Sequence, residues 1–292
     1  MTTKLAGDFL GAARLTMNVL RAVWGRAGSA LVILLISLGW APTAFAQVDA
    51  AALAKASQNP VGDLIALPFQ INFNTGGGLA DQTFLNVNFQ PVMPFKLSEN
   101  WNVVARTIIP LNSLPGPNGV RFSGVGDIQE QIYVTPSKPG GVIWGVGPML
   151  SFPTSTVGPL QTGSWAAGPG GVVLKITGPW VLGEIFNWYF TFKDTGSDTE
   201  FNYFVTQPFV NYNFGRTGWA LAFAPILTYN MDGDDHQKWT VPLGLGIVKT
   251  TVFDGKPMQL GVQYYSNAER PDSAPGQQLR FVLSFLYPRI KS

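Results

Sequence analysis

A strict alternation of apolar and amide residues between Gln82 and Pro91 is the feature that most constrains this chain. There, Leu85, Val87 and Phe89 alternate with Phe84, Asn86, Asn88 and Gln90. A period of two places the apolar residues on one face of a β-strand and the amides on the other. The chain has about eleven further segments of 10 to 16 residues, and it has no helical pattern long enough to cover an apolar sheet face. A closed barrel uses all of these segments, so the pattern predicts an all-β, transmembrane β-barrel.

The segments predict twelve antiparallel strands in up-and-down order over residues 64–288. The expected ranges are 64–73, 82–96, 101–111, 122–135, 141–154, 163–176, 180–192, 200–213, 218–230, 238–252, 257–268 and 277–287. Connections alternate between short turns and longer polar loops, which is the asymmetry between the periplasmic and outer sides of such barrels. Trp101, Trp180 and Trp219 open strands after short turns, whereas Trp165 and Trp239 follow long loops. These positions predict two aromatic girdles.

Residues 1–46 resemble a secretory signal peptide, and their apolar stretch Ala30 to Trp40 is too short to span a bilayer as a helix. Basic residues precede this stretch, and the small residues Ala44 and Ala46 predict cleavage after Ala46. The leading part is long, so Met17 is an alternative start. The other interpretation is an anchor retained in the inner membrane.

Residues 47–63 form a predicted periplasmic segment before the barrel. Asp49 to Ser57 is rich in alanine and helix-prone, and Pro60 ends the helical pattern. We interpret this segment as a linker, with a plug or latch as the alternative. Residues 289–292 are a C-terminal tail.

Composition excludes several classes of function. Without residues 1–46 the chain keeps 15 basic and 16 acidic side chains, a formal charge of −1, and it has no clustered basic face for nucleic acid. It contains no cysteine, no G-x-S-x-G motif and no phosphate-binding loop. We therefore expect no cofactor, no nucleic-acid partner and no enzymatic activity.

Two sets of residues conflict with regular strands. Proline removes a ladder hydrogen bond, so we expect bulges or rim positions at Pro68, Pro110, Pro148, Pro169, Pro208, Pro225 and Pro242. Simple alternation turns Glu130 and Glu184 toward lipid, where a carboxylate is costly near the midplane. Either a bulge shifts the phase there, or those strands are misplaced.

The single histidine, His236, follows Asp232, Asp234 and Asp235 on a predicted outer loop. Asp and Gly favour turns, so we interpret the stretch as a solvated turn. One alternative is an omptin-like hydrolase, which needs a second catalytic pair on a neighbouring loop, where residues 194–198 offer only residues typical of a turn. The other is a weak hard-cation site made by the three aspartates.

A set of polar residues is expected to line the barrel interior. Its members are Gln70, Asn72, Asn86, Asn88, Gln90, Asn102, Arg106, Asp127, Gln129, Gln131, Lys175, Gln263 and Arg280. We expect an ion pair between Arg106 and Asp127, and we expect Arg280 to face the closing seam. Such residues either fill and rigidify the interior or line a constriction that selects small solutes. Glycines at inward positions favour some open space.

Several motifs resemble one family. They are Gln58 to Gln70, Gln90 to Pro94, Trp101-Asn102 with Arg106 to Pro110, Gly124 to Gln129, Trp144 to Pro148 and Gly178 to Val181. Together they resemble the bacterial outer-membrane proteins grouped with the MetA-pathway of phenol degradation, some of which carry the name neuromedin U. The resemblance implies an outer-membrane barrel and passage of hydrophobic or aromatic compounds. It supplies no site residues.

The expected function is an outer-membrane channel or transporter for small-molecule solutes, with its exterior in contact with outer-membrane lipid. The alternatives are a non-conducting structural or surface-binding barrel and, third, the omptin-like hydrolase. During biogenesis the barrel-assembly machinery would recognise an aromatic C-terminal strand. Because residues 289–292 extend past that strand, recognition would depend on Phe285 and Tyr287.

Overall fold

The computed structural model describes residues 50–77, 82–160, 163–194 and 200–289. The chain divides into two compact units, Met1–Ala44 and Phe45–Ser292, and every described residue belongs to the second. The predicted signal peptide and its cleavage site therefore lie outside the described residues. No helix in the described ranges has the length and apolar character needed to cross a bilayer.

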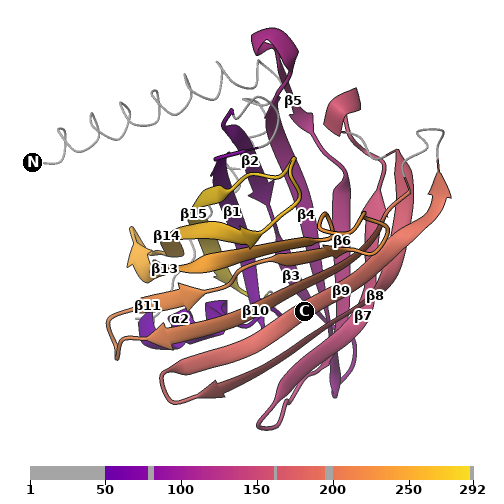
Figure 1. The fold of residues 1–292 in the computed structure, drawn as a ribbon. Coiled ribbons are helices and arrows are strands. Elements are labelled where there is room, and N and C mark those ends of the chain that lie inside the picture. Colours follow the sequence, from indigo (N-terminus) through magenta and orange to yellow (C-terminus); the bar gives the residue numbers. More distant parts are fainter. Residues whose placement is uncertain (1–49, 78–81, 161–162, 195–199, 290–292) are drawn as a thin grey trace, which may run out of the picture. The chain divides into compact units, whose positions relative to one another are not determined.

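The second unit is built from one antiparallel sheet that closes on itself (Figure 1). Its strands are β1 (Leu64–Thr75), β2 (Phe84–Phe89), β3 (Val92–Lys96), β4 (Trp101–Pro115), β5 (Arg121–Val125), β6 (Ile128–Pro136), β7 (Ile143–Phe152), β8 (Ser164–Thr177), β9 (Trp180–Asp194), β10 (Asn202–Asn213), β11 (Trp219–Phe223), β12 (Leu227–Asn230), β13 (Trp239–Phe253), β14 (Lys256–Glu269) and β15 (Gln277–Pro288). One short helix, α2 (Ala50–Ser57), precedes them, and two 3₁₀ turns, η2 (Pro117–Gly119) and η3 (Gly158–Leu160), lie in loops. β1 pairs with β15, and β9 pairs with β10. The barrel is therefore closed.

Three strands of the barrel are each interrupted by a break that divides them into two short strands. These are β2 with β3, β5 with β6, and β11 with β12. Counted this way, the barrel has twelve strand positions, which confirms the predicted number and order. Short turns at one end and longer loops at the other also follow the expected alternation. The strands begin and end within a few residues of the predicted ranges, because period-two alternation persists to the ends of most strands.

The prolines mostly occupy positions other than the expected bulges and rims. Pro68, Pro110 and Pro208 each lie opposite a break in a neighbouring strand, where there is no regular ladder for their missing N–H to interrupt. The carbonyls of Pro68 and Pro110 accept hydrogen bonds from Gln90 and Gly126, which lie in two of these breaks, at 2.9 and 2.8 Å. At these three prolines, breaks in the neighbouring strand thus replace bulges as the way in which the sheet tolerates the missing donors.

The four remaining prolines divide between predicted and unexpected positions. Pro148 and Pro169 face each other on β7 and β8, so two missing donors fall at one place in the ladder. Pro225 lies in the break between β11 and β12, and Pro242 lies at a register shift between β13 and β14. Pro242 is therefore at an irregularity of the expected kind.

The outer face is apolar and carries aromatic pairs at both ends. Exposed apolar side chains occur on strands around the barrel, among them Val146, Val173, Leu221, Leu245, Val262 and Phe281. Trp101 packs on Trp144 at the short-turn end, and Phe152 packs on Trp165 at the long-loop end, with ring centroids 6.0 and 5.6 Å apart. Such an exterior is suited to lipid rather than to water.

Glu130 and Glu184 lie on this outer face without any local shift of register. The expected bulge is therefore wrong, and the two strands are placed as predicted. Each carboxylate accepts a hydrogen bond from a threonine on the neighbouring strand, Glu130 from Thr107 at 2.6 Å and Glu184 from Thr206. These bonds offset part of the desolvation of a carboxylate at the lipid-facing surface.

Inner-facing glycines serve close packing rather than open space. A Cβ built on Gly147 would come within 1.8 Å of the Ile132 carbonyl oxygen, and one on Gly168 equally close to that of Trp188. No real side chain tolerates this distance, so these glycines let neighbouring strands approach each other. The expectation that they open the interior is wrong at these positions.

Candidate functional site

The N-terminal segment, residues 50–63, occupies the short-turn end of the barrel. Helix α2 contacts β1, β10 and β13. Lys55 Nζ donates to the Gly178 carbonyl at 2.7 Å, and the Gln58 and Asn213 side-chain amides exchange two hydrogen bonds of 3.0 and 3.1 Å. The interpretation of this segment as a linker is therefore wrong. Local sequence predicts the helix and its end, but it does not reveal contacts made with residues more than 100 positions away.

Beyond α2 the chain turns into the barrel interior at Asn59. Asn59 Oδ1 accepts the Val61 backbone N–H at 3.1 Å, a local turn in which proline at position 60 is compatible because it needs no donor. Ser57 Oγ also accepts a hydrogen bond from Gln259 Nε2 at 3.1 Å. The turn and the hydrogen bond to β14 together direct Val61 inward.

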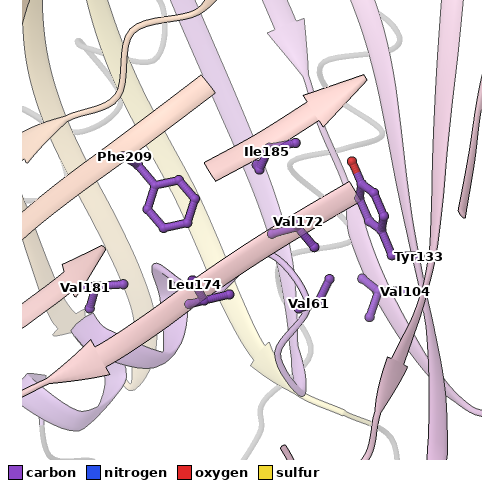
Figure 2. Close-up of a cluster of buried hydrophobic side chains, with 8 residues drawn as sticks. All are labelled: Val61, Val104, Tyr133, Val172, Leu174, Val181, Ile185 and Phe209. Carbon is purple, nitrogen blue, oxygen red and sulfur yellow. The ribbon is translucent and has the colours of Figure 1, made fainter. Parts of the chain in front are cut away.

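Val61 belongs to an apolar cluster inside the barrel, shown in Figure 2. The cluster consists of Val61, Val104, Tyr133, Val172, Leu174, Val181, Ile185 and Phe209, all at most 7% exposed. Its members come from the N-terminal segment and from β4, β6, β8, β9 and β10. One side of the interior is thus a packed hydrophobic core rather than a wetted wall.

The other side of the interior carries two arginines held by amides, which we call the arginine wall. Arg106 on β4 donates to Gln90 Oε1 at 2.6 Å and to Gln131 Oε1 at 3.3 Å. Arg280 on β15 is 4% exposed. It donates to the side-chain oxygens of Asn72, Gln278 and Gln263 at 2.9, 2.8 and 3.4 Å, and its guanidinium lies 5.1 Å from the centre of the Tyr265 ring.

Most of the other predicted interior residues join hydrogen-bond chains on this wall. Asn86 accepts from Asn72 at 2.8 Å and donates to Asn88 and Asn112 at 3.0 and 2.8 Å. Gln70 accepts from Gln90 at 3.3 Å. Gln129 bonds the Tyr189 hydroxyl across the interior. Asn102 lies nearer the short-turn end, where it accepts from Arg289 at 3.1 Å.

The expected ion pair between Arg106 and Asp127 is wrong. Arg106 lies opposite Gln131 in the ladder, and Asp127 comes four residues earlier than Gln131. At about 3.3 Å per residue this offset is roughly 13 Å, too far for an ion pair. Asp127 Oδ1 instead accepts the Ser155 backbone N–H at 3.0 Å.

Lys175 is not an interior residue. It is exposed and shares the strand face of the exposed Val173, whereas Leu174 between them is buried. Val172 to Leu174 is apolar at three consecutive positions, so alternation could not identify the inner face of β8.

The acidic outer loop does not assemble a site. Asp235 forms an exposed ion pair with Lys238 at 3.6 Å, and the Asp234 carbonyl accepts the Gln237 backbone N–H, as in an ordinary turn. No group of three His, Cys, Asp or Glu side chains in the described ranges could hold a metal ion, so the weak cation site at Asp232, Asp234 and Asp235 is not formed there. Of the loop that could supply a second catalytic group to His236, residues 195–199 lie outside the described residues.

A cavity of ≈ 210 Å³ lies between the arginine wall and the apolar side of the interior. Arg106, Arg280, Gln70, Gln90 and Gln263 line it. Facing them are apolar residues, including Ile185, Phe209, Ala222 and Val248, and residues 56–60 of the N-terminal segment also contribute. On this measure one water needs roughly 10–15 Å³, so the space is large enough for a small solute.

Three residues of this site, Gln278, Tyr265 and Val61, are not among the predicted interior residues. Gln278 and Tyr265 share strand faces with Arg280 and Gln263, so alternation offered a signal that could have found them. Val61 offered none, because its role depends on where a turn directs it inside a barrel that is complete only after residue 288.

A closed barrel with an apolar exterior, aromatic ends and a polar-lined interior defines a class: the chain is an outer-membrane β-barrel. No protein-family model matches it, and no curated protein matches it. Among solved structures, an outer-membrane channel from Pseudomonas putida F1 is similar, with 13% identity, coverage of 77% of this chain and 94% of that chain, and a TM-score of 0.55. This likeness shows a shared fold.

Two other barrels are more distant. The NanC porin is 12% identical, covers 75% of this chain and 98% of its own, and gives a TM-score of 0.49. Outer membrane phospholipase A from Escherichia coli is 11% identical. The match covers 82% of this chain and 99% of the phospholipase, with a TM-score of 0.43. The particular family suggested by the sequence motifs stays a prediction.

Proposed function

We propose that the chain is an outer-membrane channel for small molecules. The observation that carries the proposal is the cavity of ≈ 210 Å³ inside the closed barrel, which has polar groups on one side and apolar groups on the other. The likeness of the whole chain to an outer-membrane channel of the same fold also supports the proposal. Passage of hydrophobic or aromatic solutes fits the apolar side of the cavity and the motif resemblance.

The proposal includes export and assembly. Residues 1–46 act as the export signal, and Phe285 and Tyr287 on β15 present the aromatic strand to the barrel-assembly machinery. The proposal assigns the chain no catalytic step.

Reconstitution tests the proposal. Purified barrel in planar bilayers or liposomes is expected to pass ions or small aromatic solutes, whereas protein-free membranes and membranes with a barrel that side chains fill completely should not. Absence of both ionic conductance and solute flux would overturn the channel function.

The second candidate is a non-conducting structural barrel. The N-terminal segment favours it, because α2 and Val61 occupy the short-turn end and leave the interior partly filled. A deletion strain with an altered envelope and unchanged solute uptake would support this alternative over the channel.

A further inference from the structure

Arg106 and Arg280 line the same cavity although β1 and the broken strand β2 and β3 separate them around the wall. Among the described residues, ion pairs join Asp235 to Lys238 and Asp63 to Arg289, and neither cavity arginine has a carboxylate within ion-pair distance. Two like charges therefore share one interior space without an opposite charge from the wall.

The amides satisfy these arginines only in part. A guanidinium has five N–H donors, and the hydrogen bonds described above use two of those of Arg106 and three of those of Arg280. Neutral oxygens also do not balance a charge removed from bulk water. The cavity is thus positively polarised, and low-dielectric walls concentrate such a field.

The arginines are held in fixed orientations. Three amide oxygens and the Tyr265 ring position the Arg280 guanidinium, and Gln90 and Gln131 position that of Arg106. A planar guanidinium with free N–H groups matches a carboxylate, which can accept two parallel hydrogen bonds from it. Fixed orientation lowers the entropy cost of binding such a group.

The apolar side of the same cavity narrows the choice of ligand. Ile185, Phe209 and Val248 line it and offer no hydrogen-bond partner. An inorganic anion would leave this surface unused, whereas an organic acid would place its charge on the arginines and its hydrocarbon part against these residues.

We propose that the cavity binds small organic anions that join one carboxylate to an apolar body, such as an aromatic monocarboxylate. This inference rests on the proposed channel function, because the anion must reach the cavity through the lumen. It specifies the solute class: Arg106 and Arg280 hold the carboxylate, and the apolar cavity residues hold the ring or alkyl group.

Calorimetric titration of the purified barrel in detergent tests the site directly. Benzoate is expected to bind wild type at least about tenfold more tightly than benzamide, a neutral molecule of nearly the same shape, because only benzoate forms charge-assisted bonds with the arginines. Arg106→Gln and Arg280→Gln should each weaken benzoate binding by about tenfold. Lys175→Gln removes the same charge from the exposed outer face and should leave binding unchanged.

Reversal potentials in a KCl gradient separate this inference from the channel function. Wild type is expected to prefer chloride, and the double variant Arg106→Gln with Arg280→Gln is expected to lose that preference. A conducting barrel that shows no anion preference and binds benzoate no better than benzamide would overturn the inference and leave the channel intact. Benzoate binding without conductance or flux would support the anion site and overturn the channel.

Folding is checked by heat-modifiable gel migration. If an arginine variant fails to fold, the comparison of benzoate with benzamide on wild type still decides the matter. Equal affinities there would overturn the inference without any variant.

Discussion

The two sides of the barrel interior are stabilised in different ways. On the arginine wall, polar side chains bond to partners on the same or nearby strands, as Arg280 does with Asn72 and Gln278. On the opposite side, the apolar cluster is completed by Val61, which comes from outside the barrel strands. The polar side is therefore a property of the sheet itself, whereas the apolar side depends on the N-terminal segment. A barrel of this size is neither filled by its own wall nor left as an open pore.

Val61→Asp should lower the stability of the barrel more than any other variant proposed here. It disrupts packing on the apolar side of the interior and leaves the arginine wall unchanged. The new carboxylate would be buried among seven apolar cluster members without a partner, which costs about 3–5 kcal/mol for an uncompensated buried charge. We expect either that loss in the free energy of unfolding or release of residues 50–63 from the interior. Denaturant unfolding in detergent and limited proteolysis of the N-terminal segment measure the two outcomes.

Val120→Asp is the matched control, because Val120 is 52% exposed in a loop. It should change neither stability nor proteolysis. Equal behaviour of the two variants would contradict the dependence of the apolar cluster on Val61.

Tyr133→Phe tests whether the apolar cluster and the polar hydrogen bonds of the interior contribute separately to stability, because Tyr133 takes part in both. Its ring packs in the apolar cluster, while its hydroxyl lies 3.1 Å from Gln131 Oε1 and 3.4 Å from Asn187 Oδ1. The variant keeps the ring and loses only the hydrogen bonds, so we expect a loss of about 1 kcal/mol in unfolding free energy. Tyr264→Phe on the exposed outer face is the control. A loss as large as that of Val61→Asp would mean that the two sides are not separable.

Arg289→Gln should lower stability least, because it affects the point where the two ends of the barrel meet and, inside the barrel, the hydrogen bond to Asn102. Arg289 pairs with Asp63 at 2.8 Å, but the side chains are 28% and 62% exposed. We expect a loss of about 0.2–1 kcal/mol that shrinks further at high salt. Asp63→Asn should give a similar loss, and the double variant should lose less than the sum of both. If the double variant instead loses the sum of the two single losses, the ion pair contributes nothing to stability.

The sequence predicts the fold because alternation is local and repeats along the chain. It also places Arg280, Gln263 and Asn72 inside, since each alternates with apolar neighbours that face lipid. Alternation fails to identify the inner face of β8, because the residues before Lys175 are apolar on both faces of the strand. It fails again for the Arg106 and Asp127 pair, because register between strands depends on breaks that alternation does not reveal.

The N-terminal segment marks the limit of such reasoning. Alanine content and Pro60 predict where α2 ends, but the burial of Val61 depends on strands as distant as β10. Only the closed barrel brings these residues together.

The most direct test of this account is the single-channel conductance of wild type compared with a chain that lacks residues 50–62. If the lumen is a channel whose short-turn end this segment occupies, the shortened barrel will fold, as heat-modifiable migration will report, and will conduct severalfold more current than wild type. A folded, shortened barrel with the conductance of wild type, or with none, would contradict the account.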